Sequence, residues 1–213
     1  GLLLVILVGL VIIGGIKRIG QVTEKIVPSM VMIYVAASLY IIFSNYSEIP
    51  SVIKSIFTQA FYPDAIYGGF LGILVVGIRR AVFSNEGGVG SASIAHSAAK
   101  TDEPVREGIV AMIGPFIDTI IVCLMTATVI LITADKNPIY QNLIAQNTTG
   151  TIGASMTAAA FGSAISWFPW ILMIVVFLFS YSTMISWYYY GDNGWNYLFG
   201  AGSIPIYQAI FLG

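Results

Sequence analysis

Long apolar runs separated by short polar segments dominate this chain. A helix needs about 20 mostly apolar residues to cross the hydrocarbon core of a bilayer. Runs that reach or approach this length lie at 2–16, 27–43, 108–133, 165–190 and, cut short, 204–213. Pro28 is expected in the first turn of its helix, where the missing N–H has no helical partner, and Pro169 near the start of the run 165–190. The pattern predicts an all-α polytopic membrane protein.

Two polar stretches are predicted as connections, one at 17–25 and one at 134–150. The segment 44–67 is also too polar to span, but its centre, 51–61, repeats apolar residues at helical spacing. These residues fall on one face of a helix: Val52, Ile53, Ile56, Phe57 and Ala60. Such a pattern is typical of a short amphipathic helix that lies at the membrane interface.

The apolar run at 68–78 is only about half the length that a span requires. It is followed by two arginines and then by FSNEGGVGSASIAH, with glycines at 87, 88 and 90. Lys and Arg concentrate on the cytoplasmic side of membrane proteins. The links 17–25 and 100–107 carry five of these residues and the opposite loops carry two, at 54 and 136. Both links face the cytoplasm only if one broken helix crosses the membrane, at about 66–99.

Unwound backbone at membrane depth must be buried in protein or line a wet cavity. Glycines permit the unwinding and let a ligand approach the main chain. The exposed N–H groups of one half favour a carboxylate and the exposed carbonyls of the other favour an ammonium group. A zwitterionic amino acid therefore suits the break, and discontinuous helices are typical binding sites of secondary transporters. A phosphate loop lacks its GK[ST] ending here, and a simple loop between two spans remains the other alternative.

Composition supports a lipid environment and excludes several functions. Only 9% of residues are charged and 57% are hydrophobic, whereas soluble domains carry about 25% charged residues. The net charge of −1 offers no basic field for nucleic acid. The single cysteine, Cys123, cannot form an internal disulfide and is expected to be a buried, inert thiol. No nucleophile–base pair or metal-ligand cluster is apparent, so we expect neither an enzyme nor a cofactor.

Arg79, Arg80 and Glu86 flank the glycine cluster, and Asp118 interrupts the run at 108–133. The first three either mark a membrane surface or are intramembrane charges that pair with one another or with Asp118. Intramembrane charges are functional by default. We expect Asp118 to pair with Arg79 or Arg80. His96, the single histidine, is expected to be a hydrogen-bonded packing residue more than a proton carrier.

Three blocks carry a resemblance: FSNEGGVGSASIAHSAAKT, EPVREGIVAMIGPFIDTIIVCLMTA and FSYSTMISWYYYGD. They resemble the alanine/glycine:cation symporter family, within the amino acid–polyamine–organocation superfamily. The family commonly has Ala-Gly where this chain has Gly87-Gly88. The resemblance implies a LeuT-type fold of two inverted five-helix repeats. Residues 1–213 are then expected to be one transmembrane domain fragment, from about helix four to helix nine, with the remainder of the transporter chain as its partner.

The resemblance also implies substrate-binding positions. Gly90 and Ser91 would offer backbone polar groups, and Ile94 would touch the substrate side chain. Thr183 and Trp187, four residues apart, share a helical face and would form the facing wall. The indole of Trp187 would leave room for only a methyl group or a hydrogen, which fits alanine or glycine. The alternative is that Trp187 belongs to an interfacial aromatic belt with the neighbouring tyrosines.

A sodium site requires oxygen ligands, and the resemblance implies that Ser182 and Thr183 supply hydroxyls to it. The alternative is that both hydroxyls bond to carbonyls of the preceding turn. Together these observations predict Na⁺-coupled symport of alanine or glycine across the plasma membrane by alternating access, with Na⁺ as the coupling ion. Two alternatives stay open: a transporter of the same fold for another solute or coupled to H⁺, and a channel.

Overall fold

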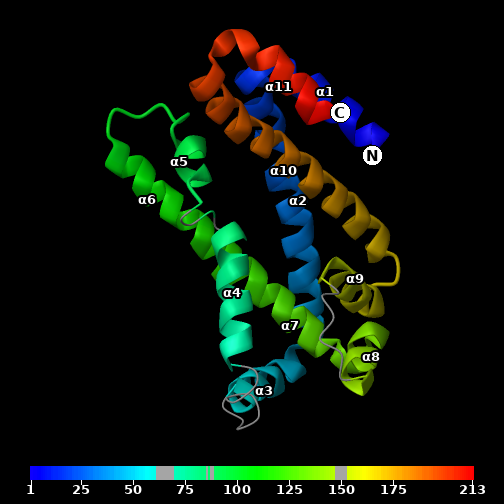
Figure 1. The fold of residues 1–213 in the computed structure, drawn as a ribbon. Helices are drawn as coiled ribbons and strands as arrows, with labels where there is room; N and C mark the ends of the chain where they lie inside the picture. Colours follow the sequence, from blue (N-terminus) through cyan, green and yellow to red (C-terminus); the bar gives the residue numbers. More distant parts are fainter. Residues whose placement is uncertain (61–69, 85, 87–88, 147–152) are drawn as a thin grey trace. The chain divides into compact units, whose positions relative to one another are not determined.

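The computed structural model describes residues 1–60, 70–84, 86, 89–146 and 153–213. Within these residues the regular structure is helical and contains no strand (Figure 1). The predicted all-α class is therefore confirmed. The chain divides into two compact units. The terminal unit comprises Gly1–Tyr34 and Ile171–Gly213, and the central unit comprises Val35–Trp170.

Helix α2 (Gly15–Ser44) contributes residues to both units and begins earlier than predicted. The polar stretch 17–25, predicted as a connection, is helical, and Pro28 lies inside the helix and not in its first turn. Both predictions are wrong for the same reason. Straight-chain polar residues lose little rotamer freedom in a helix, and the Thr23 hydroxyl bonds back to the Ile19 carbonyl at 2.9 Å. Polarity alone does not end a helix.

In the terminal unit, α1 (Leu2–Ile12) and α11 (Ile204–Leu212) lie side by side (Figure 1). The long helix α10 (Phe168–Phe199) completes the unit. Val8 and Ile12 of α1 pack with Tyr181 and Ile185 of α10 in one buried apolar cluster. Close packing of these side chains holds together helices that are distant in sequence, because many small dispersion contacts add up in a well-packed cluster.

Helix α10 is longer than the predicted span 165–190, because it continues through GDNG to Phe199. Two glycines and an Asn would ordinarily favour a turn. Here the Asn193 amide donates to the Tyr189 carbonyl at 2.8 Å. A side chain at Gly191 would collide with the Tyr207 hydroxyl of α11. Gly191 therefore serves close packing within a helix and does not mark a turn.

The central unit contains the rest of α2 and a series of shorter helices. These are α3 (Ile49–Ala60), α4 (Phe70–Ser84), α5 (Ser91–His96), α6 (Pro104–Pro115), η3 (Phe116–Cys123), α7 (Leu124–Ile132), α8 (Pro138–Gln146) and α9 (Gly153–Ala164). The amphipathic helix predicted at 51–61 is present as α3, with Val52 buried and Phe57 64% exposed, while its position at the membrane interface stays a prediction. The segment 134–150, predicted as a loop, contains α8, which is a correction.

Asn137 explains why α8 forms. Its side-chain carbonyl oxygen accepts the backbone N–H groups of Ile139 and Tyr140 at 3.0 and 3.3 Å, and its amide donates to the Met156 carbonyl. Asn is a preferred N-cap, and the following Pro138 suits the first helical position. The Asn-Pro pair thus begins a helix here.

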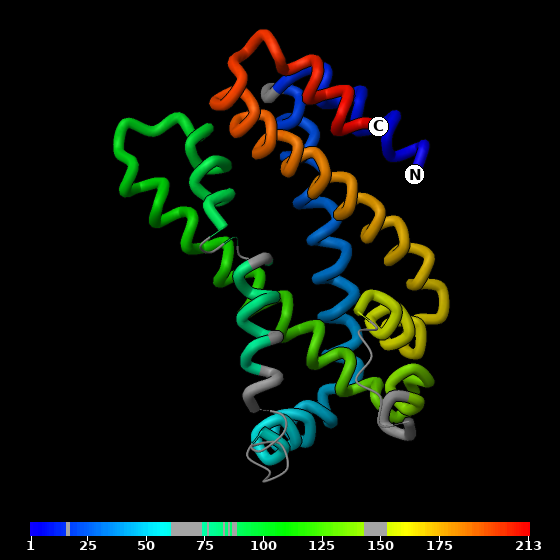
Figure 2. Tube along the Cα trace, in the orientation of Figure 1, coloured from blue at the N-terminus to red at the C-terminus, as the bar shows by residue number. Residues whose placement is uncertain are grey.

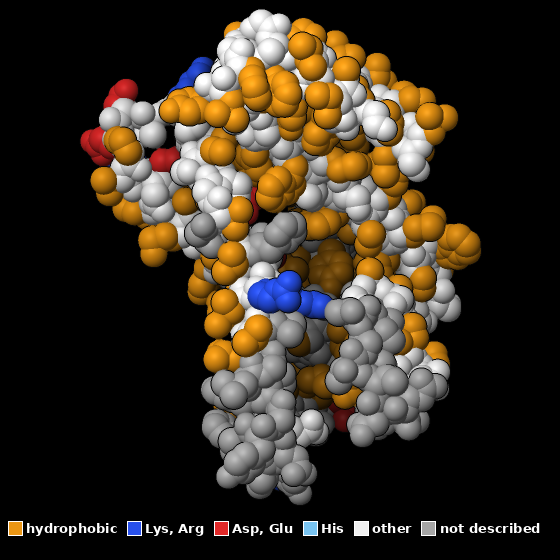
Figure 3. Space-filling model, viewed as in Figure 1, with side chains coloured by type: hydrophobic (Ala, Val, Ile, Leu, Met, Phe, Trp, Pro, Cys, Tyr) orange, Lys and Arg blue, Asp and Glu red, His pale blue; other side chains and the backbone are white. Residues whose placement is uncertain are grey.

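Much of the surface is apolar, as Figure 3 shows for one face. Among the described residues, three helices are long and apolar enough to cross a membrane: Arg18–Ser44, Pro104–Ile132 and Phe168–Phe199. Met112 and Trp170 are 73% and 70% exposed, which is costly in water and favourable in lipid. Cys123 is also exposed on this apolar surface, so the expectation that it is buried is wrong. A thiol is apolar enough to lie against lipid as readily as against protein.

Candidate functional site

The glycine-rich segment separates two helices. Helix α4 ends at Ser84 and α5 begins at Ser91, as Figure 2 traces. Glu86, Val89 and Gly90 between them are not helical, while Asn85, Gly87 and Gly88 lie outside the described residues. The interruption falls where the sequence predicted it. That this segment crosses the membrane once, at about 66–99, stays a prediction.

Two residues of the interruption have left-handed backbone angles. Gly90 has φ +92° and Glu86 has φ +54°. Glycine adopts such angles at little cost, whereas a non-glycine residue there stores about 1–3 kcal/mol of strain. Strain of this kind gathers at ligand sites and switches. The backbone at Glu86 and Gly90 therefore marks these two residues as part of a candidate site.

Ser91 is the most unusual side chain in this region. It is 5% exposed, and its hydroxyl is buried without a hydrogen-bond partner in the part of the chain that the structure describes. The neighbouring hydroxyls are satisfied locally, since Ser93 donates to the Gly90 carbonyl and Ser97 to the Ile94 carbonyl, both at 2.7 Å. A buried polar group without a partner costs about 1–3 kcal/mol. Ser91 thus has an unused donor at the start of α5.

Asp118 lies near the middle of the apolar helical stretch Pro104–Ile132, inside the π-helical turns of η3. Its Oδ2 accepts a hydrogen bond from the Ser84 hydroxyl at 2.7 Å. Among the described residues it forms no ion pair with Arg79 or Arg80, which are both exposed on α4. The predicted pairing is replaced by one with Ser84. Helix α4 continues past the arginines and ends at Ser84. The hydroxyl of Ser84, and not a guanidinium group, therefore reaches the Asp118 carboxylate.

The π-helical segment was not predicted. It follows Pro115, whose ring cannot donate a backbone hydrogen bond to the preceding turn. A π-helical insertion widens the helix and changes which residues share a face, and such insertions are frequent at functional sites. Here the insertion contains Asp118, the one acidic residue of the apolar stretch beyond the first turn of α6.

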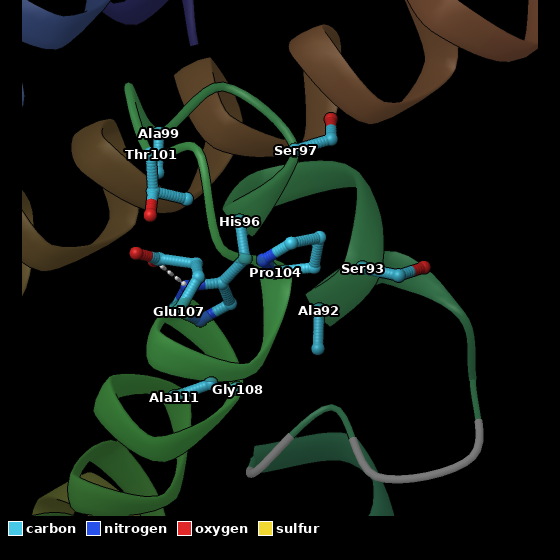
Figure 4. A pocket seen from close by; sticks show the side chains of 10 residues that line it. All are labelled: Ala92, Ser93, His96, Ser97, Ala99, Thr101, Pro104, Glu107, Gly108 and Ala111. Atoms are coloured by element: carbon cyan, nitrogen blue, oxygen red, sulfur yellow. Dashed lines mark hydrogen bonds and ion pairs between the residues drawn. The ribbon is translucent and has the colours of Figure 1, made fainter.

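A groove lies between α5 and α6 in the central unit, with a volume of about 470 Å³. Small residues line most of it, including Ala92, Gly108 and Ala111. The imidazole of His96 reaches across it to the carboxylate of Glu107, with 2.6 Å between Nδ1 and Oε1 (Figure 4). The expectation that His96 is hydrogen-bonded is confirmed. Sequence analysis did not single out Glu107.

The remaining predicted site residues lie on α10 in the terminal unit. Ser182 is buried and its hydroxyl donates to the Phe179 carbonyl at 3.0 Å, which is the alternative considered for it. Thr183 is half-buried, and no hydrogen bond of its hydroxyl occurs within the described part of the chain. Trp187 is half-buried and meets Tyr190 edge to face, with 5.6 Å between ring centroids.

The predicted site residues therefore fall into two sets. The central unit holds Gly90, Ser91, Ile94, Arg79, Arg80, Glu86 and Asp118, and the terminal unit holds Ser182, Thr183 and Trp187. Within the first set, Gly90, Ser91 and Ile94 lie together in and beside the first turn of α5. Their roles, and those of the α10 residues, stay predictions.

The described structure defines a multi-pass helical membrane protein with an interrupted helical segment and an acidic group inside an apolar helix. Comparison with known sequences assigns it to a family. The model of the sodium:alanine symporter family matches residues 1–213. The chain belongs to this family, whose members are transporters and not enzymes.

Three similar proteins illustrate the family. The sodium/alanine symporter AgcS of Methanococcus maripaludis is 41% identical over all of this chain and 46% of its own length. An uncharacterized transporter of Haemophilus influenzae is 39% identical over 99% of this chain and 46% of its own length. The probable sodium/glutamine symporter GlnT of Bacillus subtilis is 36% identical over 93% of this chain and 40% of its own length. The chain thus spans less than half the length of these relatives.

Proposed function

We propose that this chain is part of a transporter that carries a small neutral amino acid together with Na⁺ across the plasma membrane by alternating access. The observation that supports it most is the interruption between α4 and α5, where Gly90 is left-handed and the buried Ser91 hydroxyl has no described partner. Such breaks are typical of substrate sites in secondary transporters. Family membership supports the class of activity.

The interruption offers groups that suit the carboxylate and the side chain of an amino acid. Gly90 has no side chain, and the space that a Cβ atom would occupy is open. A substrate could therefore approach the main chain closely at this position. Ser91 would donate its unused hydroxyl proton to a carboxylate, removing the cost of a buried group without a partner. Ile94, one turn along α5, would contact the substrate side chain.

Coupling to Na⁺ would use hydroxyl oxygens of α10. A hard cation needs a lone pair and not a proton. The Ser182 proton is directed to the Phe179 carbonyl, which leaves oxygen lone pairs for a cation. Thr183 carries a second hydroxyl on the adjacent residue. Trp187, one turn beyond Thr183, would limit the side chain of the substrate, so alanine or glycine is the proposed substrate.

Relatives differ in the substrate that their names state, alanine for AgcS and glutamine for GlnT. The proposed preference for alanine or glycine depends on Trp187 and is open to direct test by competition with glutamine. The proposed orientation places residues 17–25, at the beginning of α2, and the link 100–107 on the cytoplasmic side, because both carry an excess of Lys and Arg.

The test uses the complete transporter that carries this sequence, reconstituted in liposomes. We expect an inward Na⁺ gradient to drive uptake of labelled alanine, and Li⁺, K⁺ or a proton gradient to support much less. Unlabelled alanine or glycine should compete better than glutamine. Counterflow of labelled alanine should occur, because a carrier exchanges substrate and a channel does not. Uptake that ignores Na⁺, or an absence of counterflow, would refute the proposal.

Ser91→Ala tests the site itself, with Ser97→Ala as the matched control. Both are serines of the same segment, but Ser97 is exposed and its hydroxyl is satisfied by the Ile94 carbonyl. Loss of a hydrogen bond to a charged substrate group corresponds to roughly 1.5–3 kcal/mol. We therefore expect Ser91→Ala to raise the KM for alanine by at least tenfold and Ser97→Ala to leave it unchanged. Equal effects would remove Ser91 from the site.

A further inference from the structure

The pair of His96 and Glu107 joins two helices of very different stability. His96 is the last residue of α5, which has only 6 residues. Glu107 lies in the first turn of α6, which continues into the long apolar stretch to Ile132. A helix as short as α5 is not stable by itself in isolation. The position of α5 therefore depends on the contacts that attach it to its neighbours.

The pair has the geometry of a charge-assisted hydrogen bond. The two atoms, Nδ1 and Oε1, are 2.6 Å apart, shorter than a typical bond between neutral groups. His96 is the last residue of α5 and Glu107 lies in the first turn of α6, so the bond joins the end of one helix to the beginning of the next.

Among the described residues that line the groove, His96 and Glu107 are the titratable ones. The other lining residues are Ala, Gly, Ser, Thr and Pro. In the adjoining turn, Arg106 is paired with Glu103 at 2.6 Å, and both are largely exposed. Lys100 and Asp102 of the connecting segment are also exposed and do not line the groove. The nearest partner of the imidazole is thus Glu107.

We propose that His96 and Glu107 together bind a proton, and that the protonated pair ties α5 to α6 and slows the transport cycle. The proton adds to the imidazole ring, which then donates through Nδ1–H to the Glu107 carboxylate as an ion pair. Removal of that proton leaves a neutral ring and a weaker hydrogen bond. Histidine is the side chain whose charge changes near neutral pH. This inference rests on the proposed function, because α5 also carries the proposed substrate residues.

The test measures exchange of labelled alanine for unlabelled alanine in liposomes that hold the complete transporter. Na⁺ concentration and pH are equal on both sides, so neither gradient drives the flux. We expect the exchange rate of the wild type to rise roughly threefold to fivefold between pH 5.5 and pH 8, as a partly exposed ion pair is lost. His96→Asn, which cannot be protonated, should give a flat profile at the high-pH rate.

Two further variants separate a proton site from a structural contact. His96→Lys retains a cation at every pH in this range, so its profile should be flat at the low-pH rate. Glu107→Gln should also remove most of the pH dependence. Glu103→Gln is the matched control, since it breaks an exposed ion pair of the same turn and should keep the wild-type profile.

Each outcome decides between the proposals. A wild type that exchanges alanine at one rate across the pH range overturns the proton site without any variant. A pH step that survives in His96→Asn or Glu107→Gln also overturns it. A wild type that exchanges no alanine at any pH refutes the proposed function itself, and this result is distinct from a flat profile.

Discussion

The hydrogen bond between Ser84 and Asp118 connects the end of α4 to the π-helical turns of η3, and its strength can be measured with a double-mutant cycle. The donor is a neutral hydroxyl and the acceptor is a carboxylate, 2.7 Å apart. Hydrogen bonds to charged groups contribute about 1.5–3 kcal/mol in soluble proteins. Polar contacts between membrane helices average about 0.6 kcal/mol and reach about 1.7 kcal/mol. Ser84 is exposed and Asp118 is half-buried. We therefore expect Ser84→Ala to lower the free energy of unfolding by about 1.5 kcal/mol, where the two ranges meet.

Asp118→Asn removes the charge but retains a carbonyl acceptor of the same shape. A charge-assisted hydrogen bond is roughly twice as strong as a neutral one. Ser84→Ala should therefore lower the free energy of unfolding by about half as much in the Asp118→Asn background, which gives a coupling of about 0.7 kcal/mol. The assay is equilibrium unfolding of the complete transporter in mixed micelles with rising dodecyl sulfate, followed by circular dichroism.

The control pairs Asp118→Asn with Arg80→Gln. Arg80 is one turn before Ser84 but is exposed and forms no described ion pair with Asp118. The structure predicts additive effects for this pair, whereas a salt bridge would produce coupling. If Ser84→Ala costs the same in both backgrounds within about 0.3 kcal/mol, the hydrogen bond does not contribute to stability and the reasoning fails.

Three further substitutions test local features by thermal unfolding of the same protein. Gly90→Ala should destabilise the protein by about 1–2 kcal/mol because the backbone there is left-handed, and not through a clash, because no atom blocks the new methyl group. Gly77→Ala in α4 is the control; it is equally unobstructed and should be neutral or stabilising. Equal effects of the two substitutions would contradict the reasoning. Gly191→Ala should destabilise because its methyl group meets the Tyr207 hydroxyl, and Tyr207→Phe should recover part of the loss; no recovery would point to another cause. Asn137→Ala should cost about 2–3 kcal/mol, as a buried cap with three hydrogen bonds is removed, and a loss below the resolution of the melt would refute the cap.

Hydrophobic periodicity predicted the elements whose boundaries coincide with a change in polarity. The helix predicted at 51–61, which is α3, and the beginning of α10, with Pro169 near its start, belong to this group. The same reasoning failed where a helix continues through polar residues, as α2 does at 17–25 and α10 does beyond Tyr190. In α10 the continuation depends on tertiary contacts with α11, such as that between Gly191 and Tyr207. Window hydropathy contains no information on such contacts.

The candidate site was only partly accessible from the sequence. Glycine density located the interruption, because few other reasons place three glycines within four residues of an apolar segment. The partner of Asp118 could not be found in this way. Ser84 is 34 positions away, and its approach depends on the end of α4 and on the π-helical turns, which change the rotation of Asp118. Pro115, three residues before the acidic residue of an apolar run, was the available signal for that irregularity.

Both contacts beside the interruption attach to the same continuous helical stretch. Ser84, just before it, bonds to Asp118, and His96, at the end of α5, bonds to Glu107. Glu107 and Asp118 are eleven positions apart, which is close to three helical turns and about 16 Å of rise. The stretch from Pro104 to Ile132 therefore holds the α4 side and the α5 side of the break at two separate points. A substrate that alters the backbone at Gly90 must either strain one of these two contacts or move α6 as well. The response of the proposed site to its ligand therefore depends on which of the two contacts is weaker. Protonation of the His96–Glu107 pair strengthens one of the two, and the Ser84–Asp118 cycle measures the other.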